Sequence, residues 1–371
     1  ILDILIPPVR KPQQQMQVVP SQTTEQKQEE VNSEEYQNQK TREWMKMKLK
    51  KALVTGGAGF IGSHLVETLV AAGCQVTVLD NLSSGDPANL KHLDRKYTFY
   101  QEDIRDPEAL LAAADKCDVI FHLAAVVSVP LTVENPVEAA AVNDMGSLLV
   151  FETARQQKVK RVVFSSSCAI YGDDPRLPKR EDMLPKPMSP YAVQKLTAEH
   201  YARVFNDLYS IETVALRYFN VYGPRQDPSS PYSGVISIFM TKALQNQAAV
   251  IYGDGNQSRD FIFVRDVVNA NLLAATAPNA CGRVLNIGSG RVVRINDLWG
   301  TICKISGRQR DPQYAHKRPG DINASLADIE RAKAVLDFDC RVSLEAGLKS
   351  TFEWYRQNQI SEDRGQKSDS R

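Results

Sequence analysis

The chain lacks several features that would point to particular classes of protein. Its 371 residues include 45 Lys plus Arg and 44 Asp plus Glu, so no basic excess supports a nucleic-acid binder. No run of about 18 apolar residues occurs, so we expect neither a transmembrane helix nor a membrane partner. The six cysteines form no CxxC pair, and histidine occurs only five times. These counts argue against a metal site or a disulfide framework and favour reduced thiols, as in a cytoplasmic protein.

The two ends of the chain differ in composition from its middle. Residues 1–47 are rich in Gln, Glu, Ser, Thr and Asn and contain few large apolar side chains. Such a segment buries too little surface to offset its ordering entropy, so we predict a disordered leader rather than a secretory signal. The basic residues of 40–51 leave a membrane-surface or RNA contact open, but a solvated leader is favoured. Residues 359–371 are also polar, which predicts a flexible tail.

Between these ends, short apolar runs alternate with amphipathic segments. Continuous apolar strands separated by helices indicate an α/β fold, a doubly wound parallel sheet covered on both faces. After about residue 223 the elements shorten, which predicts a smaller C-terminal α/β lobe that binds substrate. The predicted strands are residues 52–55, 75–80, 97–101, 118–123, 161–165 and 213–217, and the predicted helices are 61–72, 137–157 and 191–209. The predicted domains are 48–222 with about 260–281 for a cofactor, and 223–259 with 282–358 for the substrate.

A glycine-rich segment follows the first predicted strand and opens the first helix. Gly56, Gly59 and Gly62 have the spacing of a dinucleotide-binding turn, and Asp80 ends the second strand about 20 residues later. The glycines let the backbone approach a pyrophosphate, whose charge a helix N-terminus stabilises. The Asp80 carboxylate would bind a ribose and repel a 2′-phosphate, and no Arg occurs in residues 81–90. We therefore predict a Rossmann-type domain that binds NAD rather than NADP, a structural glycine turn being the alternative.

A second candidate site lies between the fifth predicted strand and the helix that follows it. Tyr191 and Lys195 are four residues apart, so a helix places both on one face. An ammonium held near a phenol lowers the tyrosine pKa from about 10, which makes Tyr191 a general base for a sugar or alcohol hydroxyl. The serines of residues 165–167 end the strand, where a hydroxyl would join the same proton network. The alternatives are a surface Tyr–Lys pair and serines that only cap the strand.

Other segments complete a recognisable pattern. They are His-Leu-Ala-Ala from His122, Ser-Pro-Tyr-Ala-Val-Gln-Lys from Ser189, and Leu-Arg-Tyr-Phe-Asn-Val-Tyr-Gly-Pro from Leu216. With the glycine turn and the serine run, they resemble the extended short-chain dehydrogenase/reductase superfamily. Within it, the chain is similar to the nucleotide-sugar 4-epimerases that act on UDP-glucose or UDP-N-acetylglucosamine. The resemblance extends from about residue 50 to residue 355 and leaves out the leader.

The resemblance implies a role for each residue at a matching position. It implies that Ser167, Tyr191 and Lys195 are the catalytic set, and it implies no metal ligand. The residues that it implies line NAD are Gly56, Gly59, Phe60, Ile61, Gly62, Asp80, Asn81, Asp103, Ile104, Tyr191, Lys195 and Tyr218. The residues that it implies contact the UDP-sugar are Ser128, Asn220, Arg259, Arg318, Asp321 and Ser325. For Asp103, simple termination of the third strand is an alternative.

The resemblance also implies how the substrate is held and selected. The guanidinium groups of Arg259 and Arg318 suit a diphosphate because each is a planar, bidentate donor, although either residue would also form a surface ion pair. In the family, a small residue at the position of Ser325 admits an N-acetyl group that a bulky aromatic residue excludes. Ser128 also resembles the N-acetyl-accepting enzymes, whereas Cys168 stands where some strongly N-acetyl-preferring enzymes have a second serine. The expected pocket admits both UDP-glucose and UDP-N-acetylglucosamine.

The implied function is NAD-dependent 4-epimerisation of a UDP-sugar through a transient 4-keto sugar. A nucleotide-sugar 4,6-dehydratase or a UDP-glucuronate decarboxylase is the alternative on the same scaffold. Those enzymes carry acidic residues directly after the catalytic hydroxyl, where this chain has Cys168 and Ala169. A non-catalytic NAD-binding protein is a further alternative, although such proteins commonly lose Tyr or Lys of the pair. The segments 137–157 and 191–209 resemble the helices that pair in homodimers of the family, but core packing would produce the same apolar stripes.

Overall fold

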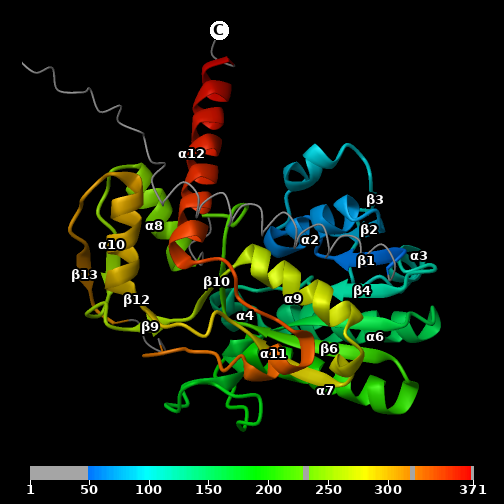
Figure 1. Ribbon diagram of the computed structural model, residues 1–371. Helices are drawn as coiled ribbons and strands as arrows, with labels where there is room; N and C mark the ends of the chain where they lie inside the picture. The colour runs from blue at the N-terminus through cyan, green and yellow to red at the C-terminus, as the bar shows by residue number, and fades with distance from the viewer. Residues whose placement is uncertain (1–48, 229–233, 318–321, 369–371) are drawn as a thin grey trace, which may run out of the picture. The chain divides into compact units, whose positions relative to one another are not determined.

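The computed structural model describes residues 49–228, 234–317 and 322–368, with side chains as far as residue 358 (Figure 1). The predicted disordered leader, 1–47, lies outside the described residues, as do Arg318 and Asp321. No helix in the described ranges has both the length and the apolarity needed to cross a membrane.

A seven-stranded sheet organises the described chain, and every neighbouring pair of its strands is parallel (Figure 1). The chain order of the first six strands reverses between β1 and β4, as in doubly wound dinucleotide-binding folds. This topology confirms the predicted fold class, and all six predicted strands are present. From one edge to the other, the strands are β11 (Arg283–Ile287), β6 (Glu212–Tyr218), β5 (Arg161–Ser167), β4 (Val119–His122), β1 (Lys51–Thr55), β2 (Gln75–Leu79) and β3 (Thr98–Tyr100).

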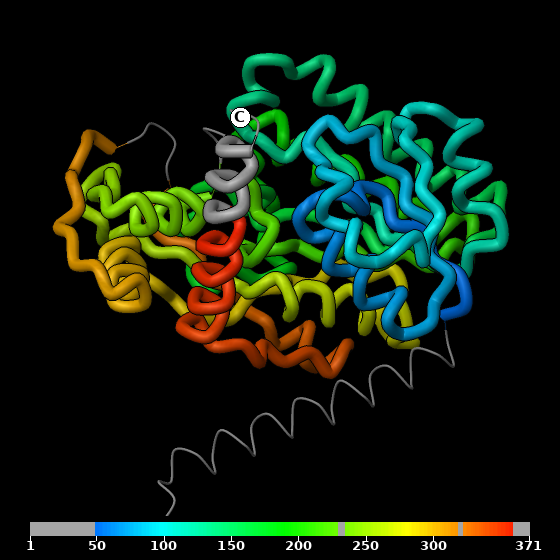
Figure 2. Tube along the Cα trace, turned by 90° about the horizontal axis from the view of Figure 1, so that it is seen from above, coloured from blue at the N-terminus to red at the C-terminus, as the bar shows by residue number. Residues whose placement is uncertain are grey.

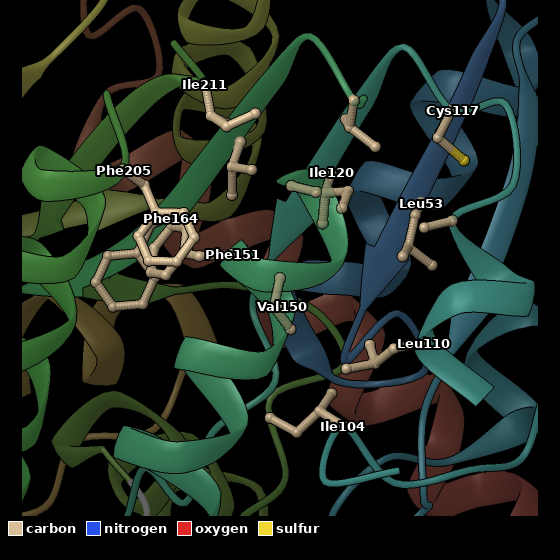
Figure 3. Packing of buried hydrophobic residues seen from close by; sticks show 14 of the residues in the cluster. Leu53, Ile104, Leu110, Cys117, Ile120, Val150, Phe151, Phe164, Phe205 and Ile211 are labelled. Atoms are coloured by element: carbon tan, nitrogen blue, oxygen red, sulfur yellow. The ribbon is translucent and has the colours of Figure 1, made fainter. Parts of the chain in front are cut away.

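Helices cover both faces of the sheet, which explains why its strands are continuously apolar. Helices α2 (Phe60–Ala71) and α9 (Val264–Thr276) pack on one face. The other face packs against α3 (Pro107–Ala113), α6 (Ser147–Gln156) and α7 (Pro190–Tyr209). Between that second helix layer and the strands lies the main core, whose larger members include Leu53, Ile120, Phe151, Phe164 and Phe205 (Figure 3).

The predicted helix 137–157 is interrupted. It consists of α5 (Pro136–Ala140), a π-helical turn, η2 (Ala141–Gly146), and α6. At Gly146 a Cβ atom would lie 2.6 Å from the end of the Ile104 side chain, so a larger residue there would displace that side chain. A π-helical turn in an α-helix often marks a functional site. This one positions Asn143, whose role is described below.

A smaller lobe lies beside the large sheet, where α8 and α10 run side by side in both views (Figures 1 and 2). Its core joins Phe239 and Trp299, whose ring centroids are 5.3 Å apart, to Phe352 of α12. The lobe and its connections contain α8 (Val235–Leu244), α10 (Ile295–Ser306), α12 (Leu344–Ser368), β7 (Asn220–Tyr222), β8 (Val250–Tyr252), β9 (Ser258–Arg259), β10 (Phe261–Phe263), β12 (Val293–Arg294) and β13 (Gln313–Ala315). The remaining elements are η1 (Pro87–Leu93), α4 (Val129–Glu134), η3 (Cys168–Tyr171), η4 (Pro278–Ala280) and α11 (Glu330–Leu336).

Two segments bear on the predicted domain boundaries. Strand β11 belongs to the large sheet, not to the substrate lobe, because it pairs with β6 along the edge that β5 leaves open. In the predicted flexible tail, the backbone of α12 remains helical as far as Ser368. That stretch is polar but contains Glu, Arg, Gln and Lys, which are good helix formers.

Candidate active site at the carboxyl ends of the strands

The glycine turn joins β1 to α2 and is packed tightly against its neighbours. Gly56 has a φ of +70°, and a Cβ atom there would lie 2.8 Å from the backbone nitrogen of Ala124. A Cβ atom at Gly62 would lie only 2.1 Å from the carbonyl oxygen of Gly56. Because Gly59 is the N-cap of α2, no side chain covers the first N–H groups of that helix. A turn of this shape suits the pyrophosphate of a dinucleotide, and the predicted contact of these glycines with NAD stays a prediction.

Acidic side chains follow the ends of β2 and β3, and that of Asp80 contacts this turn. The Asp80 carboxylate is 7% exposed and accepts hydrogen bonds from the backbone nitrogens of Ala58 and Leu82, both at 2.9 Å. Asn81 donates to the Asp103 carboxylate at 2.9 Å, so two further predicted NAD residues meet. Hydrogen bonds from Arg105 lower the pKa of Asp103 to about 2, and the carboxylate is therefore ionised. Asp80 thus holds the glycine turn in place, and its contact with NAD stays a prediction.

The larger side chains predicted to line NAD are mainly packed into the protein. Ile104 is buried in the main core, and Phe60 and Ile61 pack against the core of the smaller lobe. The Tyr218 hydroxyl donates to the Asn271 side chain at 2.9 Å. Direct contact between these residues and NAD remains a prediction.

The three predicted catalytic residues meet between β5 and α7. The N-terminus of α7 is fixed by Ser189, whose hydroxyl accepts a hydrogen bond from the backbone nitrogen of Ala192 at 3.2 Å. Tyr191 therefore lies in the first turn, where its phenol shares a hydrogen bond with Ser167 at the end of β5. One turn later, the Lys195 ammonium lies 5.8 Å from the centre of the Tyr191 ring. The site therefore contains a phenol, a hydroxyl and an ammonium group in one cluster.

The protonation of this cluster differs from the sequence prediction. Burial raises the pKa of Tyr191 to about 12, although the hydrogen bond from Ser167 opposes the shift. Burial also lowers the pKa of Lys195 to about 7, against the opposing charge of Glu199. The ammonium donates to the carbonyl oxygen of Ser165 at 2.8 Å. Loss of hydration therefore outweighs the predicted effect of Lys195 on the phenol, because burial disfavours the charged form of each group.

A buried polar chain, which the sequence analysis missed, connects β1 to the catalytic helix. Thr55 Oγ1 lies 2.8 Å from His122 Nδ1, and His122 Nε2 lies 2.9 Å from Ser147 Oγ. The Ser147 hydroxyl donates to the carbonyl oxygen of Asn143, whose side-chain amide donates to Gln194 of α7 at 2.7 Å. Burial lowers the pKa of His122 to about 3, so its ring is neutral. In the sequence, only the position of His122 at a strand end pointed to this network of hydrogen bonds, because the residues that form it are far apart along the polypeptide.

Ser325 lies next to the catalytic strand. Its side chain is 3% exposed, and its backbone nitrogen donates to the carbonyl oxygen of Ser258 at 3.1 Å. The Ser325 hydroxyl shares a hydrogen bond with the thiol of Cys168, the residue after Ser167. The position predicted to select the sugar is therefore in direct contact with the strand end that bears the catalytic hydroxyl.

The other predicted substrate residues are held mainly by backbone contacts. Asn220 donates through its side-chain amide to the carbonyl oxygen of Asp260 at 3.0 Å, and Arg259 donates to that of Ser258 at 2.8 Å. Neighbouring positions on β7, β9 and β10 therefore bring Asn220 and Arg259 to one region. Ser128 instead caps α4 by accepting a hydrogen bond from the backbone nitrogen of Leu131 at 3.2 Å. The predicted contact of Ser128 with the sugar stays a prediction.

Known proteins are similar to this chain in sequence and in fold. A family model described as the NAD dependent epimerase/dehydratase family matches residues 52–288. A UDP-glucose 4-epimerase of Mycolicibacterium smegmatis is 40% identical over 310 residues, which are 82% of this chain and 98% of that protein. A UDP-N-acetyl-alpha-D-glucosaminuronate decarboxylase of Bacillus cytotoxicus is 34% identical over 320 residues, 83% of this chain and 98% of that one.

A solved structure agrees with these relatives. The UDP-N-acetylglucosamine 4-epimerase from Methanobrevibacter ruminantium, in complex with UDP-N-acetylmuramic acid, matches with a TM-score of 0.81 and 41% identity. The match covers 84% of this chain and 99% of that one. The glycine turn and the Ser–Tyr–Lys cluster fit the NAD cofactor of this family. The chain belongs to the NAD-dependent epimerase/dehydratase family, among the UDP-sugar epimerases.

Proposed function

We propose that the chain is a 4-epimerase that interconverts UDP-glucose and UDP-galactose and also accepts UDP-N-acetylglucosamine and UDP-N-acetylgalactosamine. The observation that carries this proposal is the meeting of Ser167, Tyr191 and Lys195 at the carboxyl end of β5, the sheet edge that also holds the glycine turn. In open α/β sheets, ligands bind at this edge. A phenol and a dinucleotide turn together provide for removal of a proton and a hydride from one carbon.

The roles of the residues follow from this arrangement. NAD, held by the glycine turn, would supply the acceptor and then the donor of the hydride exchanged at the sugar C4. Tyr191 removes the proton of the C4 hydroxyl, and Ser167 hydrogen-bonds the same oxygen. The Lys195 ammonium is proposed to stabilise the phenolate during the reaction, against the burial that keeps Tyr191 protonated before substrate binds. The product of this step is a 4-keto sugar, which Tyr191 reprotonates at oxygen in the reverse direction. The glycine turn and the N-terminus of α2 bind the pyrophosphate, so the chain's main contribution is orientation.

The proposed substrate site uses residues from both lobes. Ser325 leaves room for an N-acetyl group because its side chain is small and bonded to Cys168. Arg259 and Asn220 are proposed to contact the diphosphate and the nucleotide sugar. Arg318 and Asp321, outside the described residues, are proposed to contribute a second phosphate contact and a contact to the uridine ribose.

Dehydration or decarboxylation on the same scaffold is less well supported. Both reactions use an acidic side chain directly after the catalytic hydroxyl, whereas this chain has Cys168 and Ala169. The backbone nitrogen of Ala169 donates to the Ser167 hydroxyl at 3.1 Å, and burial raises the pKa of the Cys168 thiol to about 12. A neutral thiol is a poor acid or base at neutral pH. The decarboxylase relative therefore does not displace epimerisation as the proposed reaction.

Product analysis with one variant tests the proposal. Purified protein is incubated separately with UDP-glucose, UDP-N-acetylglucosamine and UDP-glucuronate, and the products are resolved by chromatography. We expect C4 epimers of the first two, without loss of water or carbon dioxide. Tyr191→Phe should reduce turnover by about 10²- to 10⁴-fold and retain NAD, because only the proton acceptor is removed. A 4-keto-6-deoxy or pentose product, or full activity of Tyr191→Phe, would refute the proposed reaction.

We also propose that two copies of the chain pair through α5, η2 and α7. These elements pack against one another and expose apolar side chains that would otherwise face water. Val137 of α5 is 82% exposed and Met145 of η2 is 55% exposed. Val193 and Leu208, 15 positions apart on α7, are 48% and 69% exposed and lie on one helix face. A second copy of the same surface would bury these side chains in a two-fold symmetric interface.

A further inference from the structure

A buried carboxylate joins the catalytic helix to two strands. Glu199 of α7 is 5% exposed, and its Oε1 accepts hydrogen bonds from Ser166 Oγ at 2.6 Å and Arg217 Nε at 2.9 Å. Its Oε2 accepts from Arg217 Nη2 at 2.7 Å, which makes the ion pair bidentate. Arg217 is itself 4% exposed and stacks on the Tyr171 ring, 4.8 Å from its centre. A bidentate pair with both partners buried fixes relative position more strictly than a surface pair.

The partners of Glu199 are neighbours of the catalytic residues. Ser166 directly precedes Ser167 on β5, and Glu199 follows Lys195 by one helical turn, on the same face of α7. The Lys195 ammonium is bonded to the carbonyl oxygen of Ser165, so two polar contacts join these turns of α7 to the end of β5. A shift of Glu199 would therefore change the distance between Lys195 and Ser167.

We propose that Glu199 is a positioning residue for the reaction: it ties α7 to the strand that bears Ser167 and presents a negative charge to the Lys195 ammonium. The expected effect of Glu199 on epimerase turnover rests on the proposed function. The electrostatic coupling between Glu199 and Lys195 does not. The role of Glu199 is distinct from catalysis, since it acts through Lys195 and Ser166 rather than on the substrate.

Among the titratable groups around Lys195, Glu199 is the one whose charge stabilises the ammonium form. His122 of β4 is neutral because burial lowers its pKa to about 3, and Tyr191 is neutral because burial raises its pKa to about 12. Arg217 of β6 is cationic but bonded to Glu199. Burial lowers the pKa of Lys195 to about 7, and Glu199 opposes this shift. Without the carboxylate, the ammonium would lose its proton at a lower pH.

The test is the titration of Lys195 in Glu199→Gln, a variant that keeps the shape of the side chain. The protein is labelled with ¹³Cε-lysine, and the Lys195 signal is assigned by its loss in Lys195→Arg. We expect the titration midpoint to fall by about one pH unit in Glu199→Gln. Turnover of UDP-glucose should fall several-fold with little change in KM, and its pH profile should shift in the same direction. The midpoint is independent of activity, so it distinguishes this inference from the proposed function.

Glu212→Gln is the matched control. Glu212 pairs with the buried Arg161 at 2.5 Å, at the amino ends of β5 and β6, away from Lys195. The Glu212→Gln variant should be less stable than the wild type but should leave the titration midpoint of Lys195 unchanged. If Glu199→Gln does not fold, the double variant Glu199→Gln/Arg217→Met removes both buried charges. It should show a smaller shift in the same direction, because loss of the Arg217 cation offsets part of the loss of the carboxylate. An unchanged Lys195 midpoint in the folded variant would overturn the inference. A shifted midpoint in a protein that epimerises no UDP-sugar would uphold the coupling and refute the proposed function.

Discussion

Replacing Gly62 by alanine tests whether the glycine turn is as tight as the structure requires. A Cβ atom there would lie 2.1 Å from the Gly56 carbonyl oxygen and 2.8 Å from the Gly57 Cα. Favourable contacts between non-bonded heavy atoms lie near about 3.5 Å, so the turn must move by about 1 Å. Because both obstructing atoms belong to the backbone, no side-chain rotation relieves the clash.

The expected magnitude follows from this displacement. Inserting a methyl group into closely packed structure costs about 1–3 kcal/mol of folding free energy. The same movement shifts the N–H groups at the start of α2, on which the pyrophosphate is proposed to bind. If about 2–3 kcal/mol of NAD-binding free energy is lost, the Kd rises roughly 30- to 150-fold. Calorimetric titration with NAD measures the affinity, and urea unfolding measures the stability.

Gly300→Ala is the control for the general effect of removing a helical glycine. Gly300 lies in α10 and is exposed, and a Cβ atom there would meet no other atom within 4 Å, so alanine fits. Its higher helix propensity should stabilise the protein by about 1 kcal/mol and leave NAD affinity unchanged. The reasoning is refuted if Gly62→Ala binds NAD and unfolds like the wild type.

Three further predictions concern selectivity, pH and assembly. Ser325→Tyr should abolish conversion of UDP-N-acetylglucosamine while UDP-glucose is still epimerised; an unchanged ratio of kcat/KM values would contradict the proposed pocket. The folded pKa of Lys195 is about 7 and its ordinary value 10.5, so the folded state binds fewer protons between these pH values and gains stability as pH rises. The free energy of unfolding of the wild type, measured with urea relative to Lys195→Met, should therefore rise by about 3 kcal/mol between about pH 7 and 9.5. If the difference in unfolding free energy between the two proteins stays constant over this range, the lowered pKa of Lys195 is contradicted. Val137→Asp combined with Leu208→Asp should convert the proposed dimer to a monomer in light scattering, whereas equal masses would exclude this interface.

The apolar runs and the glycine spacing were enough to predict the sheet and its cofactor turn. Buried parallel strands must be apolar throughout, and a tight turn before a helix needs glycine, so both leave a local signal. Strand β11 left a weaker signal, because five residues among short elements fit equally well into the smaller lobe. The close packing of Gly146 against Ile104 was also invisible, since it joins residues that are distant in the sequence.

For the site, the sequence by itself predicted which residues carry the chemistry, and the tertiary structure decided their electrostatic surroundings. The spacing of Tyr191 and Lys195 places both on one face of a helix, and Glu199 continues that face at the same spacing. Sequence reasoning predicted a lowered pKa for Tyr191, but burial raises it. The hydrogen bonds of Glu199 to Ser166 and Arg217 join residues 33 and 18 positions apart. Desolvation and such contacts depend on which segments the fold brings together, and no local pattern in the chain records them.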